Sequence, residues 1–226
     1  MNHNVPMPSR PLIIAIDGPS GAGKGTVART LAERLGYTHV DTGAMYRAVA
    51  WMAGHNGLDL ADEEAVAAVA DAASFEIGRE VRVDGHDITR AIRTPEMDAA
   101  AGIVARHPKV RESLVRRQRE YAGRGGIVME GRDIGTVVFP RADLKVFLDA
   151  AADERARRRA HDPAHTSSQS GAVDQVATAL AERDRLDTTR KTSPLAMASD
   201  AVRIDTTGMS VDEVVEKVMD LVKLQI

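Results

Sequence analysis

The residues best suited to chemistry form a glycine-rich stretch near the start of the chain. It consists of Gly18, Pro19, Ser20, Gly21, Ala22, Gly23, Lys24, Gly25 and Thr26. The stretch follows the apolar run over residues 12–16 and precedes a segment with helical patterning, the context of a loop that wraps phosphate with its backbone N–H groups. The helix dipole favours an anion at the same place. This pattern predicts binding of a nucleoside triphosphate, with Lys24 at the β- and γ-phosphate oxygens and the Thr26 hydroxyl at a phosphate or at Mg²⁺.

Arginines are the second feature that could do chemistry. Arg47 and Arg132 follow the second and third predicted strands, at the sheet edge where doubly wound folds bind ligands. Guanidinium groups bind phosphate oxygens bidentately and stay charged, so this pair suggests a second anionic group close to the triphosphate. The GTPase motif Asn-Lys-x-Asp is absent from the sequence. We therefore expect phosphoryl transfer from ATP to an acceptor that is itself phosphorylated, a reaction that depends on alignment and charge neutralisation.

These residues must be positioned by alternating strands and helices, a pattern typical of a parallel sheet covered by helices. We expect strands near residues 12–16, 37–40, 127–129, 144–148 and 201–205. We expect helices near residues 24–35, 43–54, 62–73, 95–105, 109–123, 151–160, 172–187 and 211–223. Over residues 74–93, apolar and polar residues alternate and Asp84-Gly85 marks a tight turn, which predicts a small antiparallel insertion. The fold class is therefore α/β, with a five-stranded parallel sheet.

Several motifs together give the sequence a specific resemblance. Residues 14–26 contain the phosphate loop, residues 41–47 are Asp-Thr-Gly-Ala-Met-Tyr-Arg, and residues 131–140 are Gly-Arg-Asp-Ile-Gly-Thr-Val-Val-Phe-Pro. With the segment Glu182–Arg190, they resemble the bacterial cytidylate kinases from about residue 12 to the C-terminus. The loop is shared with many kinases, whereas the run over 131–140 is far more specific. The resemblance implies the P-loop NTPase fold and transfer of the γ-phosphoryl group of ATP to CMP or dCMP, with Mg²⁺.

The resemblance also implies a division of the chain. We expect a disordered tail over residues 1–11 and a single kinase domain over residues 12–226. Its core would comprise residues 12–57, 106–150 and 191–226, with an insertion that binds the nucleoside monophosphate at about 58–105. A helical lid would span about 151–190 and contain the Ser- and Gln-rich connection at 166–171.

Single residues receive roles from the same resemblance. The ATP side would comprise residues 18–26 with Arg157 and Arg158 of the lid, and the catalytic residues would be Lys24, Arg132 and Arg190. The acceptor would be bound by Asp41, Tyr46, Arg47, Gly102, Arg111, Arg132, Asp133, Arg183, Asp187 and Arg190. Among these, Arg47 and Arg132 would hold the 5′-phosphate, Arg111 and Asp133 would contact cytosine, and Arg183 with Asp187 would contact the sugar.

Base recognition combines one agreement with one departure. A carboxylate such as that of Asp133 accepts a hydrogen bond from the exocyclic amine of cytosine and repels the O4 acceptor of uracil. The family commonly has a serine that touches the base where this chain has Gly102. One hydrogen bond to cytosine is therefore missing or mediated by water.

Several alternatives remain open from the sequence. Arg155–Arg159 could be a solvated helix face or a weak RNA-binding patch. Asp41 could be no more than the N-terminal cap of a helix. Asp184 and Asp187 could be surface partners of nearby arginines. The protein could also be a small-molecule kinase of the shikimate or gluconate type, or a non-catalytic nucleotide-binding module.

Composition limits the remaining classes. The chain has 226 residues, 43% of them hydrophobic, and a formal net charge of -3, which argues against a dedicated nucleic-acid binder. It has no cysteine, and its seven histidines lack the spacing of metal ligands, so we assign no metal-ligating residue. No apolar run approaches the length of a membrane span. We expect a cytoplasmic monomer that binds neither nucleic acid nor membrane.

Overall fold

The computed structural model describes residues 10–123, 125–162 and 173–225, and a parallel sheet lies at its centre. Within these residues, the sheet has the strand order β2 (Thr38–Asp41), β6 (Ile127–Gly131), β1 (Ile13–Asp17), β7 (Leu144–Asp149), β8 (Val202–Asp205). The central strands are covered on both faces, so Ile14 and Ala15 are both fully buried. This burial explains why these strands have continuous apolar sequences. The predicted α/β class with five parallel strands is confirmed.

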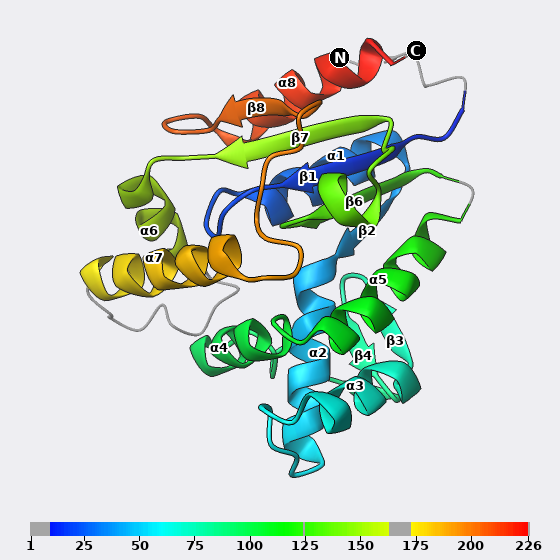
Figure 1. Ribbon diagram of the computed structural model, residues 1–226. Helices are drawn as coiled ribbons and strands as arrows, with labels where there is room; N and C mark the ends of the chain where they lie inside the picture. The colour runs from blue at the N-terminus through cyan, green and yellow to red at the C-terminus, as the bar shows by residue number, and fades with distance from the viewer. Residues whose placement is uncertain (1–9, 124, 163–172, 226) are drawn as a thin grey trace.

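Helices form a layer on each face of this sheet (Figure 1). On one face, α1 (Lys24–Leu35) and α8 (Val211–Lys223) pack against the strands in one apolar cluster. On the other face, α5 (Pro108–Ala122) and the single π-helical turn η1 (Ile134–Val138) pack against Ile127 and Met129. Both faces of β1 and β6, the strands that lead to the loops described below, are therefore packed against helices.

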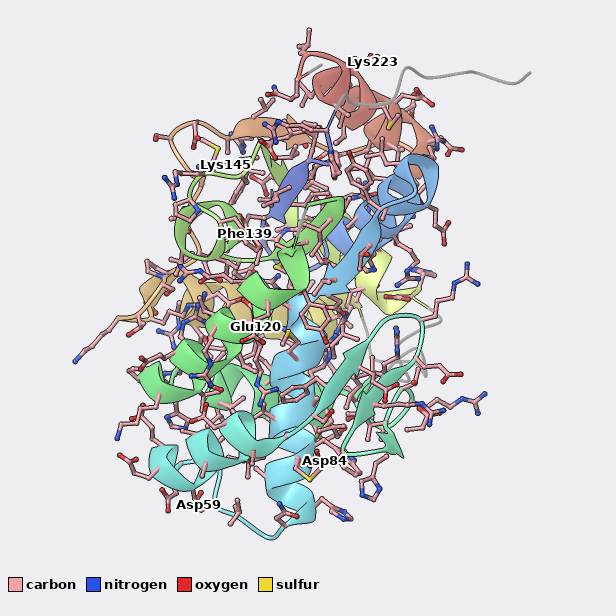
Figure 2. All side chains as sticks on the ribbon, turned by 90° about the vertical axis from the view of Figure 1, so that its right-hand side faces the viewer. Asp59, Asp84, Glu120, Phe139, Lys145 and Lys223 are labelled. Carbon is pink, nitrogen blue, oxygen red and sulfur yellow. The ribbon has the colours of Figure 1, made fainter. Side chains whose placement is uncertain are left out.

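A second group of elements lies below the sheet in Figure 1. It comprises α2 (Thr42–His55), α3 (Glu63–Ala72), β3 (Phe75–Ile77), β4 (Val81–Val83), β5 (His86–Asp87) and α4 (Pro95–Val104). The three short strands form the predicted antiparallel insertion, and its turn at Asp84-Gly85 has positive φ at both residues. Figure 2 shows Asp84 beside the distal end of α2, at the opposite end of the molecule from Lys223 on α8.

Two further helices, α6 (Ala152–Ala160) and α7 (Val173–Thr189), correspond to the predicted lid and pack against each other. α7 also contacts α4, as Figure 1 shows. The predicted connection over residues 166–171 lies outside the described residues, as do residues 1–9 of the predicted tail. Among the helices in the described ranges, none combines the length and the apolar character that crossing a membrane requires.

Candidate active site

A cavity of about 660 Å³ lies where the carboxyl ends of β1, β2 and β6 face α4, α6 and α7. Most of the residues assigned from the sequence line it: Ser20, Gly21, Ala22, Gly23, Lys24, Gly25, Thr26, Asp41, Tyr46, Arg47, Gly102, Arg111, Arg132, Asp133, Arg158, Arg183, Asp187 and Arg190. Three assigned residues that the structure also describes, Gly18, Pro19 and Arg157, lie outside this lining. Residues from distant parts of the chain therefore share one site.

The phosphate loop connects β1 to α1 through conformations that require glycine. At Gly18, φ is +147° and an added Cβ would lie 1.9 Å from the carbonyl oxygen of Leu148. Gly23, at φ 86°, precedes α1 and provides no side-chain cap. The N–H groups of the first helical turn lack intrahelical acceptors, so this end of α1 suits an anion.

Lys24 is the buried cation of this loop. The residue is 5% exposed, and its Nζ donates a hydrogen bond to the carbonyl oxygen of Pro19 at 2.6 Å. Burial, reinforced by the charge of Arg132, lowers the pKa of Lys24 to about 7. A phosphate beside Nζ would favour the charged form and would offer a stronger acceptor than the carbonyl.

Hydrogen bonds connect the predicted lid to the phosphate loop. The N–H of Ser20 donates to Asp184 Oδ1 at 3.0 Å, and Arg155 donates to the Ser20 carbonyl oxygen at 2.9 Å. Arg155 and Asp184 also form an ion pair with each other. Sequence reasoning missed this arrangement, since it interpreted Asp184 only as a possible surface partner of nearby arginines.

Three assigned arginines are paired with aspartates in the same cavity. Arg47 pairs with Asp41 at 2.9 Å, and Arg132 pairs with Asp187 at 2.9 Å. Arg190 lies 3.7 Å from Asp187. The Nε atom of Arg47 is buried without a hydrogen-bond partner among the described residues. The cluster therefore has donor capacity left for an anionic ligand.

Asp41 has two roles in this arrangement. Its side chain accepts a hydrogen bond from the N–H of Ala44 at 3.0 Å and so caps α2. Its other carboxylate oxygen accepts a hydrogen bond from Arg47, less than two helical turns further along α2. Asp41 therefore caps α2, but it is not only a cap, because the same carboxylate also orients an arginine of the cavity.

Asp133 lies in a buried charge network. Its side chain is 8% exposed and forms an ion pair with Arg111, which is 3% exposed. Arg190 approaches the other carboxylate oxygen at 3.5 Å. The guanidinium carbon of Arg111 lies 5.6 Å from the ring centroid of Tyr46. Burial raises the pKa of Asp133, and the charge of Arg111 opposes that rise.

The loop that carries Arg132 and Asp133 is held by a residue that sequence reasoning did not select. The Asp17 carboxylate, at the end of β1, accepts hydrogen bonds from the N–H groups of Ile134 at 2.8 Å and Gly135 at 2.7 Å. Burial raises the pKa of Asp17 to about 6. Since β1 ends in the phosphate loop, Asp17 fixes the two halves of the site relative to each other.

The oxygen donors beside the loop fit Mg²⁺. Glu130 is the penultimate residue of β6 and lines the cavity, and an added Cβ on Gly25 would lie 3.0 Å from its Oε1. The Thr26 hydroxyl belongs to the same first turn of α1. Within the described residues, no group of three or more His, Cys, Asp or Glu side chains could hold a metal. Mg²⁺ is usually held by one or two carboxylates, waters and substrate phosphates, and one carboxylate with one hydroxyl could contribute to such a set.

The remaining assigned residues differ in position. Arg158 lines the cavity and donates to the Thr206 carbonyl oxygen at 2.7 Å. Arg157 is 63% exposed and pairs with Glu154, so the structure does not bring it to the cavity. An added Cβ on Gly102 would meet nothing within 4 Å, which leaves open space where α4 lines the cavity.

Comparisons with known proteins agree with this architecture. Residues 14–224 match the family described as cytidylate kinase. A cytidylate kinase of Geobacillus kaustophilus (strain HTA426) is 48% identical over 222 residues, which cover 96% of this chain and 99% of the relative. A bifunctional pantoate ligase/cytidylate kinase of Prochlorococcus marinus (strain MIT 9303) is 46% identical over 224 residues, or 96% of this chain. The chain spans 46% of the length of that relative, about half.

Among solved structures, an uncharacterized protein from Eubacterium ventriosum ATCC 27560 is similar over 93% of this chain and 98% of its own. The TM-score is 0.52 at 11% sequence identity, so this likeness concerns the fold alone. The family match and the Geobacillus relative both extend over nearly the whole chain. The chain belongs to the cytidylate kinase family.

Proposed function

We propose that the chain transfers the γ-phosphoryl group of ATP to CMP or dCMP, giving ADP and CDP or dCDP. The observation that carries this proposal is the presence of two anion-binding groups in one cavity: the phosphate loop, and the arginines 47, 132 and 190. The family of the chain supports cytosine as the base. Both nucleotides would then meet with their phosphates between the loop and the arginines.

The proposed reaction needs alignment more than acid–base chemistry. An oxygen of the acceptor 5′-phosphate attacks the γ-phosphorus, and the bond from that phosphorus to the β–γ bridging oxygen breaks. Lys24 and the first turn of α1 would hold the β- and γ-phosphates, with Arg158 on the same side. Arg132 and Arg190 would neutralise charge on the transferred group. A well-placed arginine contributes on the order of 10³–10⁵-fold to such a reaction.

The proposed acceptor contacts follow from the buried network. Asp133 would accept a hydrogen bond from the cytosine amine while Arg111 holds the carboxylate in place. Arg47 would bind the 5′-phosphate with Tyr46 beside it, and Asp187 with Arg183 would contact the sugar. Gly102 leaves space next to this group.

We assign Mg²⁺ to the donor side of the cavity. The Thr26 hydroxyl and the Glu130 carboxylate would hold the ion, directly or through water. When bound, the ion would neutralise charge on the β- and γ-phosphates.

We also propose that the enzyme works as a monomer in the cytoplasm, where nucleotides are available. Residues of a single chain supply every contact assigned to the two nucleotides. Light scattering coupled to size-exclusion chromatography tests the oligomeric state.

The proposed function is tested by measuring ADP release with CMP, dCMP, UMP, AMP, shikimate or no acceptor. We expect fast release with CMP and dCMP and at most slow release with shikimate or without acceptor. Release that depends on shikimate would indicate a small-molecule kinase. Equal release with and without acceptor, or no release in any reaction, would contradict the proposed transfer.

A further inference from the structure

Asp98 is the meeting point of three arginines that come from three different helices. It lies near the start of α4, and its side chain is 13% exposed. Arg159 of α6 pairs with its Oδ2. The Oδ1 atom lies 3.1 Å from a guanidinium nitrogen of Arg183 on α7 and 3.7 Å from one of Arg47 on α2.

The three arginines line the cavity, whereas Asp98 does not. The carboxylate therefore lies behind the guanidinium groups and leaves the space for a ligand open. A carboxylate that competed with the acceptor phosphate would have to lie in that space. This placement favours a supporting role for Asp98 over an inhibitory one.

The charges around Asp98 also favour a supporting role for its carboxylate. Without Asp98, the guanidinium groups of Arg159 and Arg183 would face each other and Arg47 at low exposure. Arg183 and Arg47 each lower the pKa of the Arg159 side chain, burial being the largest cause, while Asp98 raises it. Arg47 also pairs with Asp41. Asp98 is therefore above all the countercharge that Arg159 and Arg183 share.

The ion pairs also connect parts of the fold that are separate in the chain. α4 is anchored in the apolar cluster around Ala100, Ala101 and Val104, which also contains residues of α2. Arg159 and Arg183 belong to the two helices of the predicted lid. Asp98 thus joins the lid helices to the acceptor side of the cavity (α4 and α7 in Figure 1).

We propose that Asp98 is a positioning residue for phosphoryl transfer. Its carboxylate holds the guanidinium groups of Arg159 and Arg183 next to that of Arg47, on the acceptor side of the cavity. The inference rests on the proposed function, because it assigns the arginines to an acceptor nucleotide. It also gives Arg159, to which the sequence analysis assigned no role, a place at the acceptor.

Asp98→Asn tests this inference, since it keeps the shape of the side chain and removes its charge. We expect KM for CMP to rise about 10- to 100-fold, because the charged hydrogen bond from Arg159 and the ion pairs with Arg183 and Arg47 lose their negative charge, while KM for ATP changes less than threefold. Asp98→Glu should recover at least half of the loss on a logarithmic scale. Amide exchange in α7 with CMP and ADP bound should be faster in Asp98→Asn than in the parent.

Asp71→Asn is the matched control, since Asp71 is an exposed aspartate of α3 that pairs with Arg116. It should behave as the parent in all these measurements. If the parent phosphorylates CMP and Asp98→Asn matches the control, the inference is wrong. Equal increases in KM for CMP and ATP in both Asp98→Asn and Asp98→Glu would also overturn it, because they would indicate general loosening. A parent without CMP kinase activity would instead contradict the proposed function.

Discussion

Replacing Lys24 by methionine should stabilise the empty protein and abolish most of its turnover. Lys24 is 5% exposed, and burial lowers the pKa of its ammonium group from 10.5 to about 7. Because the folded-state pKa is the lower one, the unfolded chain binds more protons, and the charge destabilises the folded state at pH values below about 7. This penalty disappears as the pH rises from about 7 towards 10.5.

The size of the effect follows from the same values. A shift from 10.5 to about 7 corresponds to about 4 to 5 kcal/mol at low pH. Methionine also loses the hydrogen bond to the Pro19 carbonyl oxygen, which costs about 1 kcal/mol. The attraction between Lys24 and the carboxylates of Glu130 and Asp17 is already contained in the shifted pKa, so it is not subtracted again. A net stabilisation of about 3 kcal/mol, or roughly 6–12 °C in Tm, is expected at pH 6.

Thermal unfolding of the nucleotide-free protein at pH 6 and pH 10 measures this difference. Lys24→Met should exceed the parent at pH 6, and the advantage should shrink at pH 10. Its kcat for CMP should fall by at least about 10²–10³-fold, since a preorganised charge on the transferred phosphate is lost. Lys217→Met, at an exposed position of α8, is the control and should change neither quantity.

Two results would refute this reasoning. A lower Tm of Lys24→Met at pH 6 would mean that the buried charge stabilises the empty loop. Activity within tenfold of the parent, with a normal unfolding curve, would mean that the loop does not bind the phosphoryl donor.

Other predictions concern the acceptor and the predicted lid. Asp133→Ala should lower the CMP/UMP ratio of kcat/KM by roughly 5- to 150-fold. The same variant should also have a lower Tm, because Arg111 remains buried without its partner. Equal losses of kcat/KM with CMP and UMP would mean that Asp133 only orients arginines. The cavity has room for the side chain of Gly102→Ser, and this variant should lower KM for CMP a few-fold. Gly102→Ala lacks the hydroxyl and should leave KM for CMP unchanged. Identical KM values for the two variants would exclude a hydrogen bond from the serine to the base. Amide exchange in α6 and α7 should slow when a bisubstrate mimic binds, and unchanged exchange would argue against closure of a lid.

The elements of this fold were predictable because each has a local signal. Thr94 caps α4 ahead of a proline, and Ser210 with Glu213 forms the capping box of α8. The strand order was not predictable in the same way, since pairing of β1 with β6 and β7 depends on contacts between residues far apart in the sequence. The π-helical turn η1 was not predictable either. Its first residue, Ile134, donates a backbone hydrogen bond to Asp17, which lies 117 residues earlier in the sequence.

The residues of the site likewise differ in whether the local sequence could predict them. The phosphate loop is continuous in sequence, and Arg47 and Arg132 follow strands whose carboxyl ends lie together, so both were predictable. Asp98 and Asp184 were missed because each acts through a partner on another element. Arg157 and Arg158 are neighbours in sequence, yet successive residues of a helix point about 100° apart, so only one of them lines the cavity.

The charged side chains of the site are arranged in two different ways. On the acceptor side, Arg47 and Arg132 each have an aspartate partner, so these guanidinium groups are held ready without strong mutual repulsion. On the donor side, Lys24 bonds a carbonyl oxygen and its charge is destabilised by burial. An anion at the phosphate loop therefore supplies the countercharge that Lys24 needs. An anion at Arg47 and Arg132 instead binds guanidinium groups that already have aspartate partners. The loop gains stability when it is occupied, and the paired arginines instead provide fixed geometry for the acceptor.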